Sequence, residues 1–136
     1  MNVKLRTASE LMTRELVMID ASESLRAAAA LMSARHVHCL IVPPSDPKRC
    51  LGVITTKDIV QILCDGEPSH LDGLRVSDAM TSPAFCVQQE FLVVDCLKLM
   101  RMAGVRSVPV LDGARAVGIL SFTDVLRALS SEASDD

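Results

Sequence analysis

Apolar residues recur at helical spacing in two separate parts of the chain. The repeating positions are Leu25, Ala28, Ala29 and Met32 in the first part, and Val93, Cys96, Leu97 and Met100 in the second. Residues spaced i, i+3, i+4 and i+7 lie on one face of an α-helix. The pattern predicts two amphipathic helices, over residues 24–35 and 90–103. Gly104 stands where a C-terminal cap glycine belongs, and His36 holds that position in the first half.

Apolar segments rich in Val, Ile and Leu follow each helix and predict pairs of β-strands. The first pair covers residues 37–42 and 51–55, and the second covers 105–111 and 116–121. A Pro-rich turn, "PPSDPKRC", joins the first pair. The second pair turns through "LDGARA", whose Asp-Gly step is typical of a hairpin.

Each half also has a predicted element at its beginning and another at its end. Short strands are expected at 16–19 and 84–87, and closing helices at 57–64 and 123–129. The chain is therefore interpreted as two βαββα units. The fold class expected from this order is α/β of the α+β type, with small sheets packed with helices.

The two halves also match each other in sequence, which indicates an internal repeat. "ASELMT" aligns with "VSDAMT", so that Ser9 matches Ser77, and "GVITTKD" aligns with "GILSFTD". A half of about 60 residues is marginal for independent folding. The predicted boundaries are repeat 1 at 7–64, a linker at 65–75, repeat 2 at 76–130 and a disordered tail at 131–136.

Composition narrows the classes of function. Hydrophobic residues make up 49% of the chain, the only aromatic residues are three Phe, and the net charge is −3. Without a run of Lys and Arg or stacking aromatics, we expect no nucleic-acid partner. No apolar run is long enough to span a membrane, and the N-terminus lacks a signal sequence. We therefore expect a cytoplasmic location and no membrane partner.

The five cysteines lie at positions 39, 50, 64, 86 and 96, without a C-x-x-C pair. Each has apolar neighbours in the sequence. This pattern favours buried thiols in a reducing compartment over disulfides.

The repeated phrase that ends in Asp58 and Asp124 has two readings. Thr55-x-x-Asp58 and Ser121-x-x-Asp124 each fit a helix capping box, which needs no ligand. The same groups, a hydroxyl and a carboxylate beside free backbone N–H groups, also suit a nucleoside phosphate, because a carboxylate accepts hydrogen bonds from a ribose diol. The sequence alone leaves both readings open.

Three motifs in the same order in both halves resemble the tandem CBS domain, or Bateman module. They are "ASELMT", "HVHCLIV" and "LGVITTKDIVQIL" in the first half, and "VSDAMT", "GVRSVPVLD" and "VGILSFTDVLRAL" in the second. The resemblance covers about residues 7–130. It implies two repeats related by a pseudo-twofold axis, which often form dimers. It also implies clefts between the repeats that bind AMP, ADP, ATP or S-adenosylmethionine as a regulatory ligand.

The resemblance also implies which residues line these two clefts. In the first cleft, Thr55, Lys57 and Asp58 would face a wall formed by Met80, Phe85, Val105, Arg106 and Pro109. In the second, Ser121, Thr123 and Asp124 would be completed by Met12, Val17, Val37 and His38.

The halves depart from one another at two of these positions. Ile41 stands where the second half has Pro109, and Lys57 replaces the hydroxyl residue Thr123. Lys57 either adds a phosphate contact or blocks its cleft. We expect the Asp58 cleft to prefer phosphorylated ligands, because Lys57 and Arg106 are both basic.

Metal binding and catalysis find little support in the sequence. His36 and His38 would share one face of a strand while Cys39 points away, so no metal site is expected. Nothing isolates a catalytic nucleophile beside a base, so we predict no catalytic residues and no cofactor.

The function predicted is therefore that of a regulatory, non-enzymatic module. An adenine nucleotide binds between the repeats and changes their packing or the geometry of a homodimer, and an unidentified regulated protein responds. Two alternatives remain, a ligand-free dimerisation scaffold and an unrecognised enzyme.

Overall fold

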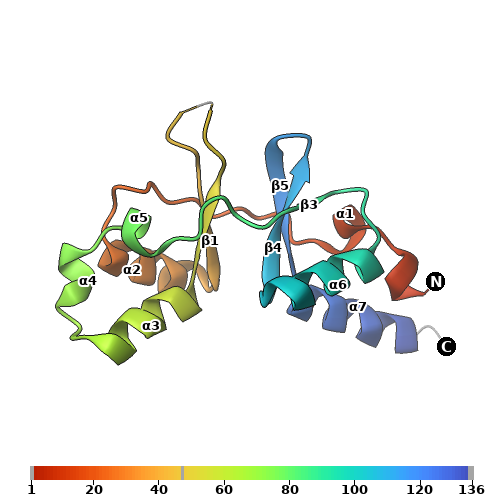
Figure 1. The fold of residues 1–136 in the computed structure, drawn as a ribbon. Coiled ribbons are helices and arrows are strands. Elements are labelled where there is room, and N and C mark those ends of the chain that lie inside the picture. Colours follow the sequence, from red (N-terminus) through yellow and green to blue (C-terminus); the bar gives the residue numbers. More distant parts are fainter. Residues whose placement is uncertain (1, 47, 135–136) are drawn as a thin grey trace. The chain divides into compact units, whose positions relative to one another are not determined.

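The computed structural model describes residues 2–46 and 48–134. It has a mixed α+β fold in which small sheets pack with helices, as expected. The chain forms two compact units. The central unit is Val17–Ala84, and the terminal unit combines the residues up to Leu16 with those from Phe85 onward. Figure 1 shows the elements of both units along the chain.

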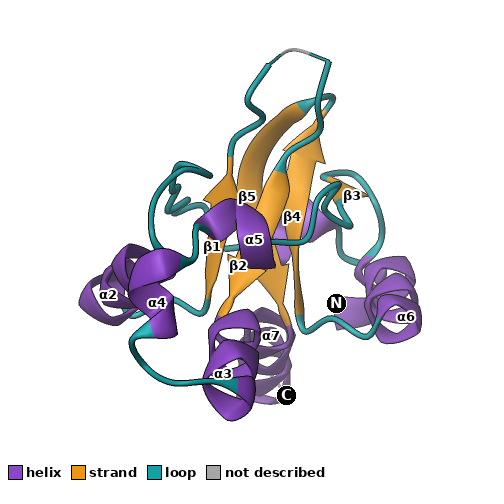
Figure 2. Ribbon diagram, turned by 60° about the vertical axis from the view of Figure 1, so that its left-hand side comes forward, coloured by secondary structure: helices purple, strands orange, loops and turns teal. Residues whose placement is uncertain are grey.

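The central unit contains a two-stranded antiparallel sheet. Strands β1 (Cys39–Val42) and β2 (Gly52–Thr55) pair along their whole length, and α3 (Thr56–Asp65) begins directly at the end of β2 (Figure 2). Helix α2 (Leu25–Arg35) packs against β1, α3 and the short α4 (His70–Gly73). The predicted hairpin and both long helices of this half are confirmed.

The terminal unit contains a three-stranded sheet in the order β3-β4-β5. The short β3 (Val87–Gln88) runs parallel to β4 (Ser107–Asp112), and β4 pairs antiparallel with β5 (Arg115–Ser121). Helices α6 (Val93–Ala103) and α7 (Phe122–Ser134) are both in contact with η1, a 3-10 turn at Val3–Leu5.

The lead-in segments exchange places between the halves. Helix α1 (Ala8–Leu11) comes from the start of the chain but lies in the terminal unit, where the backbone of Thr13 pairs with Ile119 on β5. Helix α5 (Val76–Ala79) lies in the central unit, where Thr81 pairs with Val53 on β2. Each unit is therefore completed by the lead-in segment that precedes the other copy of the repeat.

The buried positions follow the helical stripes found in the sequence. In the central unit Leu25, Ala28 and Met32 are buried, and Ala29 packs beside them. In the terminal unit the equivalent buried positions are Val93, Cys96 and Met100, with Leu97 beside them. The amphipathic interpretation of both helices is confirmed.

The helix ends also match the sequence. Ser24 caps the start of α2 by accepting a hydrogen bond from the backbone N–H of Ala27 at 3.0 Å. Helices α2 and α6 each end in a left-handed residue, at His36 (φ 54°) and at Gly104 (φ 70°), respectively. A left-handed conformation costs free energy for a residue with a Cβ, so His36 is held there by its surroundings.

Several predicted elements are shorter than expected or differ in type. The strand expected at 16–19 is reduced to one parallel bridge between Met18 and Ile41. The strand expected at 84–87 is the two-residue β3, and α6 begins at Val93, because Phe91 donates a turn hydrogen bond to Gln88 just before it. These segments are extended, but each pairs with its neighbour over one or two residues only.

Two segments are more ordered than the sequence indicated. Helix α7 continues to Ser134, although a disordered tail was expected from residue 131; residues 135 and 136 of that tail lie outside the described residues. The stretch 65–75, interpreted as a linker, contains α4, whose Leu71 joins the core of the central unit. Asp72 on the same turn forms an ion pair with Arg26 of α2.

The expectation that every cysteine is buried is wrong. Cys96 is buried, Cys39 and Cys86 are half-buried, and Cys50 and Cys64 are exposed. Cys64 lies near the end of α3, on its solvent side, and Cys50 lies in the loop before β2. Apolar neighbours in sequence did not indicate burial here, because successive helix residues point in different directions.

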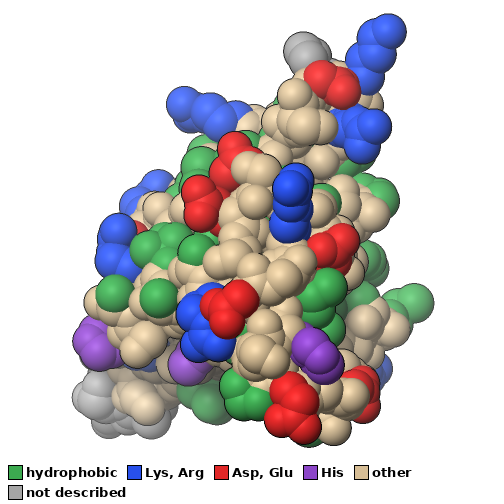
Figure 3. Space-filling view, turned by 90° about the vertical axis from the view of Figure 1, so that its left-hand side faces the viewer, with side chains coloured by type: hydrophobic (Ala, Val, Ile, Leu, Met, Phe, Trp, Pro, Cys, Tyr) green, Lys and Arg blue, Asp and Glu red, His purple; other side chains and the backbone are tan. Residues whose placement is uncertain are grey.

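No helix within residues 2–46 and 48–134 combines the length and the apolar character needed to cross a membrane. On the face shown in Figure 3, acidic and basic side chains are interspersed among apolar ones.

Candidate functional site

Each unit contains a corner where the last strand meets the start of the following helix. The Asp58 corner, in the central unit, consists of Gly52, Thr55, Lys57, Asp58 and Thr81. The Asp124 corner, in the terminal unit, consists of Gly118, Ser121, Thr123, Asp124 and Thr13. These corners bring together the repeated phrase of the sequence and the lead-in threonine of the other copy.

In the Asp58 corner, the capping interpretation of the sequence is confirmed. Asp58 Oδ2 accepts hydrogen bonds from the backbone N–H of Thr55 at 2.8 Å and from its hydroxyl at 3.0 Å. The N–H of Asp58 donates to Thr55 Oγ1 at 3.4 Å. The other carboxylate oxygen, Oδ1, has no partner within the part of the chain that the structure describes, and the side chain is half-buried.

In the Asp124 corner, both carboxylate oxygens are occupied. Oδ2 accepts from the backbone N–H of Ser121 at 2.8 Å and from its hydroxyl at 2.9 Å. Oδ1 accepts from the Thr13 hydroxyl at 2.8 Å and from the Arg127 guanidinium at 3.1 Å. Asp124 is 4% exposed and is the one charged side chain buried among the described residues.

The glycine in each corner allows a lead-in segment to lie close to the strand. A Cβ on Gly52 would lie 3.1 Å from Met80 Sδ and 3.2 Å from the carbonyl oxygen of Thr81. A Cβ on Gly118 would lie 2.5 Å from Met12 Sδ and 2.8 Å from the carbonyl oxygen of Thr13. The need for glycine is thus steric in both corners and stronger in the Asp124 corner.

The residues just before β1 and β4 are hydrogen-bonded to the starts of α3 and α7, respectively. The carbonyl of His38 accepts a hydrogen bond from the N–H of Thr56, and the carbonyl of Arg106 accepts one from the N–H of Phe122, both at 3.0 Å. His38 therefore lies beside the Asp58 corner, and Arg106 lies beside the Asp124 corner.

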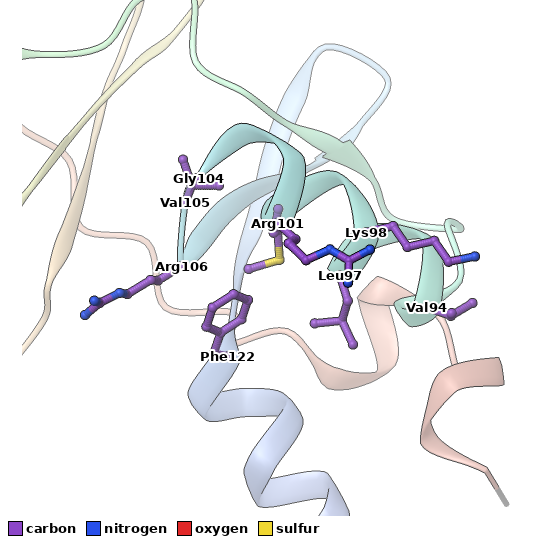
Figure 4. A pocket seen from close by; sticks show the side chains of 9 residues that line it. Val94, Leu97, Lys98, Arg101, Gly104, Val105, Arg106 and Phe122 are labelled. Atoms are coloured by element: carbon purple, nitrogen blue, oxygen red, sulfur yellow. The ribbon is translucent and has the colours of Figure 1, made fainter.

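A groove runs between the two long helices of each unit. In the terminal unit it encloses about 570 Å³ between α6 and α7 and is lined by Val105, Arg106 and Phe122, among others. Figure 4 shows the Phe122 ring turned toward α6, while the Arg106 side chain extends away from Lys98. In the central unit the equivalent groove encloses about 540 Å³ and is lined by Val37, His38 and Thr56, among others.

The remaining residues expected to line the clefts fall in one unit or the other. Of the residues expected to complete the Asp58 cleft, Met80 lies in the same unit as Asp58. The others lie in the terminal unit, namely Phe85, Val105, Arg106 and Pro109. Of the residues expected to complete the Asp124 cleft, Met12 lies in the same unit as Asp124, and the others lie in the central unit, namely Val17, Val37 and His38. Val17, Met12 and Pro109 are buried, so in this structure they offer little surface to a ligand.

Three residues that sequence reasoning did not assign belong to these corners, namely Thr13, Thr81 and Arg127. Thr13 and Thr81 end the aligned phrases "ASELMT" and "VSDAMT", and that alignment was the signal that could have found them. Arg127 has no counterpart in the first half, where Gln61 stands, but its i,i+3 spacing from Asp124 on the closing helix was a local signal for this ion pair.

The histidines do not form a metal site with Cys39. His36 caps α2, as its position in the sequence indicated, and β1 begins at Cys39 instead of residue 37, so neither histidine lies on a strand. Within residues 2–46 and 48–134, no group of three or more His, Cys, Asp and Glu side chains is placed to hold a metal ion.

The pKa is clearly perturbed at Cys96, Glu10 and Asp20. Burial raises the pKa of the Cys96 thiol to about 11. A hydrogen bond from the backbone N–H of Thr7 lowers the pKa of Glu10, and one from the N–H of Ser22 lowers that of Asp20. These carboxylates cap turns, so their perturbed pKa values reflect local structure.

Comparison with known proteins gives a consistent family match. The family model for the CBS domain matches residues 8–65 and again residues 76–131. A CBS domain-containing protein from Dictyostelium discoideum is 30% identical over 129 residues, which cover 88% of each chain. The chain spans 39% and 31% of the length of two longer archaeal relatives.

Solved structures with the same fold include a hexameric CBS-CP12 protein from bloom-forming cyanobacteria. It has a TM-score of 0.85 and 30% identity, over 90% of this chain and 67% of that one. The CBS domain pair of protein MJ0100, in complex with 5′-methylthioadenosine and S-adenosyl-L-methionine, has a TM-score of 0.80 and 20% identity, over 94% of this chain and 98% of that one. The latter similarity concerns the fold.

Proposed function

Because this chain belongs to the CBS-domain family and carries a tandem pair of its domains, we propose that it is a regulatory module that binds an adenosine-containing nucleotide at the Asp58 corner. The observation that carries the proposal is the unpartnered Oδ1 of Asp58 in a half-buried position. A carboxylate accepts about four hydrogen bonds, and Asp58 uses two of them within its own capping box. The remaining two match the two hydroxyls of a ribose.

The surroundings of Asp58 suit a phosphorylated ligand. Lys57 is exposed at the start of α3 and forms no ion pair with a described residue. A cation at this end of a helix opposes the helix dipole, so Lys57 gains little from its own helix and is available to a phosphate. By the family pattern, Met80, Phe85, Val105 and Arg106 would supply contacts to the base and the phosphate, whereas the buried Pro109 offers little surface for one.

The solved relatives support the class of ligand and an oligomeric state, but do not identify either for this chain. The domain pair of MJ0100 holds two adenosine derivatives, and the CBS-CP12 protein is hexameric. We propose a homodimer whose geometry changes when the nucleotide binds, with no catalysis. Binding can shift such an equilibrium only by the difference in affinity for the two states.

Thermal and calorimetric titrations with AMP, ADP, ATP and S-adenosylmethionine test the proposal. A ligand at about 100 times its dissociation constant stabilises the folded state by about 2.7 kcal/mol. We expect one of the four to raise the melting temperature, and we expect Asp58→Asn to abolish that rise. Asp65→Asn, the same charge change at the other end of α3, is the matched control and leaves the dissociation constant within about twofold.

The proposal fails if none of the four ligands, at millimolar concentration, moves the melt. It also fails if Asp58→Asn and Asp65→Asn bind equally well. Conversion of the nucleotide to product would instead support an enzyme.

A specific observation favours the scaffold alternative as well. Helix α7 exposes Phe122 (39%), Leu126 (63%) and Leu129 (42%), which lie on one face of the helix. An apolar stripe of this kind is typical of a surface that pairs with another protein. Sedimentation of the wild type and of Leu126→Glu, without nucleotide, tests it: a dimer that Leu126→Glu dissociates supports pairing through this face.

A further inference from the structure

We infer that Asp124 has a structural role: its carboxylate forms a latch, a set of hydrogen bonds from Thr13 and Arg127 that holds the segment around Thr13 against the start of α7. Because this carboxylate is then not available to a ligand, each chain binds one nucleotide, at Asp58. The statement about nucleotide binding, referred to below as the binding half of the inference, rests on the proposed function. The statement about Asp124, the latch half, concerns only the hydrogen bonds of its carboxylate and can be measured without a ligand.

The hydrogen-bonding capacity of Asp124 is already used. A carboxylate has about four acceptor positions. Asp124 fills two of them with Ser121, one with Thr13 and one with Arg127. A ribose diol could bind Asp124 only by displacing the last two donors, one of which is charged.

The latch joins segments that are distant in sequence. Thr13 exchanges two backbone hydrogen bonds with Ile119, each 2.9 Å long, and its hydroxyl reaches Asp124 at the start of α7. The backbone N–H of Val3 also meets Glu132 on the same helix, at 3.4 Å. The segment from Val3 to Thr13 is thereby held against α7 at both of its ends.

The Asp58 corner has the same backbone without the latch. Thr81 exchanges backbone hydrogen bonds of 2.9 and 3.0 Å with Val53, but its hydroxyl does not bond to Asp58. Gln61 stands in the place of Arg127, and the hydrogen bonds that the Asp58 carboxylate accepts from described residues both come from Thr55. The lead-in segment also lies farther from its strand here: the Cβ position of Gly52 is 3.2 Å from the carbonyl of Thr81, against 2.8 Å between that of Gly118 and Thr13.

The binding half is tested by counting ligands. We expect calorimetry with AMP, ADP, ATP and S-adenosylmethionine in turn to give one site per chain. Asp58→Asn should weaken binding by about 30-fold or more, and Asp124→Asn by less than about threefold. Two sites in the wild type, or equal losses in the two variants, would overturn the inference.

If Asp124→Asn fails to fold, a variant that removes the two donors to Asp124 Oδ1, so that the Asp124 corner resembles the Asp58 corner, provides an independent check. Thr13→Val with Arg127→Gln frees both acceptor positions on Asp124 Oδ1. We expect this double variant to bind a second nucleotide, and a count that stays at one would contradict the role given to these two donors.

The latch half is measured in the ligand-free protein by a double-mutant cycle. Thr13→Val and Asp124→Ala should be coupled by at least about fivefold in the unfolding equilibrium constant, because each removes the bond between the Thr13 hydroxyl and Asp124 Oδ1. The matched cycle, Thr81→Val with Asp58→Ala, should show no coupling. If the first cycle shows coupling but calorimetry detects no binding of any of the four ligands, the latch is retained and the proposed function is rejected. Equal coupling in both cycles would reject the latch.

Discussion

The Asp58 and Asp124 corners share a backbone but differ in how closely their parts pack. In both, a hydroxyl and an aspartate cap the helix, and a lead-in threonine pairs with the preceding strand. In the Asp124 corner the carboxylate is 4% exposed and bonded on both oxygens, whereas in the Asp58 corner it is half-buried and one oxygen is left over.

This difference shows which part of the duplicated pattern is structural. The capping box is present in both corners, so it accounts for the shared hydroxyl and aspartate without any ligand. The corners differ in how closely the lead-in segment lies to the strand that contains the corner glycine. They also differ at two helix positions, where Lys57 corresponds to Thr123 and Gln61 corresponds to Arg127. The shared motif thus caps a helix in both copies, and among the described residues it leaves a carboxylate oxygen without a partner at Asp58 but not at Asp124.

The largest expected effect on stability comes from the two corner glycines. Gly118→Ala places a methyl group 2.8 Å from the backbone oxygen of Thr13, which a side-chain rotation cannot relieve. We expect it to destabilise the protein by about 2–3 kcal/mol, and Gly52→Ala by about 1 kcal/mol, since overpacking costs about 1–3 kcal/mol. Urea unfolding of the two variants measures the difference, and equal losses would contradict the closer approach in the Asp124 corner.

The next effect is a pH dependence that belongs to the terminal unit. Cys96 of α6 occupies the place that buried Ala28 occupies in α2. Its pKa of about 11 in the folded protein exceeds that of a thiol in the unfolded chain, so the unfolded chain binds fewer protons as the pH rises above about 9. Stability should therefore fall with rising pH, by up to about 2–3 kcal/mol at pH 11, at about 1.4 kcal/mol per pH unit.

Cys96→Ala, which copies Ala28 into the terminal unit, should remove this fall. Unfolding free energies at pH 8, 9 and 10 for the wild type and the variant provide the test. Parallel pH profiles would show that ionisation of Cys96 is not linked to folding.

The smallest expected change in stability concerns the residues that cap the C-terminal ends of α2 and α6. His36→Gly relieves a left-handed residue that carries a Cβ, and should stabilise the central unit by about 0.5–1 kcal/mol. Gly104→Ala introduces the same strain in the terminal unit and should cost about 1 kcal/mol. Changes of the same sign in thermal melts would show that something other than the backbone conformation governs these caps.

Sequence reasoning succeeded where a feature depends on neighbours within about one helical turn. The stripes that contain Leu25 and Val93, the caps at His36 and Gly104, and the capping box of Thr55 and Asp58 were all read from short spacings. It was less accurate for the short extended segments around Met18 and Val87, because pairing there depends on the edge of a distant strand.

The sequence by itself determined the repeated order of elements, the buried faces of the long helices and the CBS family, since each follows from local spacing and from motifs repeated in order. Only the tertiary structure decided that the lead-in segments exchange units and that the Thr13 hydroxyl reaches Asp124. The physical reason is that a carboxylate binds whichever donors the fold brings within hydrogen-bonding distance. Thr13 and Asp124 are far apart in the chain, and no local pattern records that they meet.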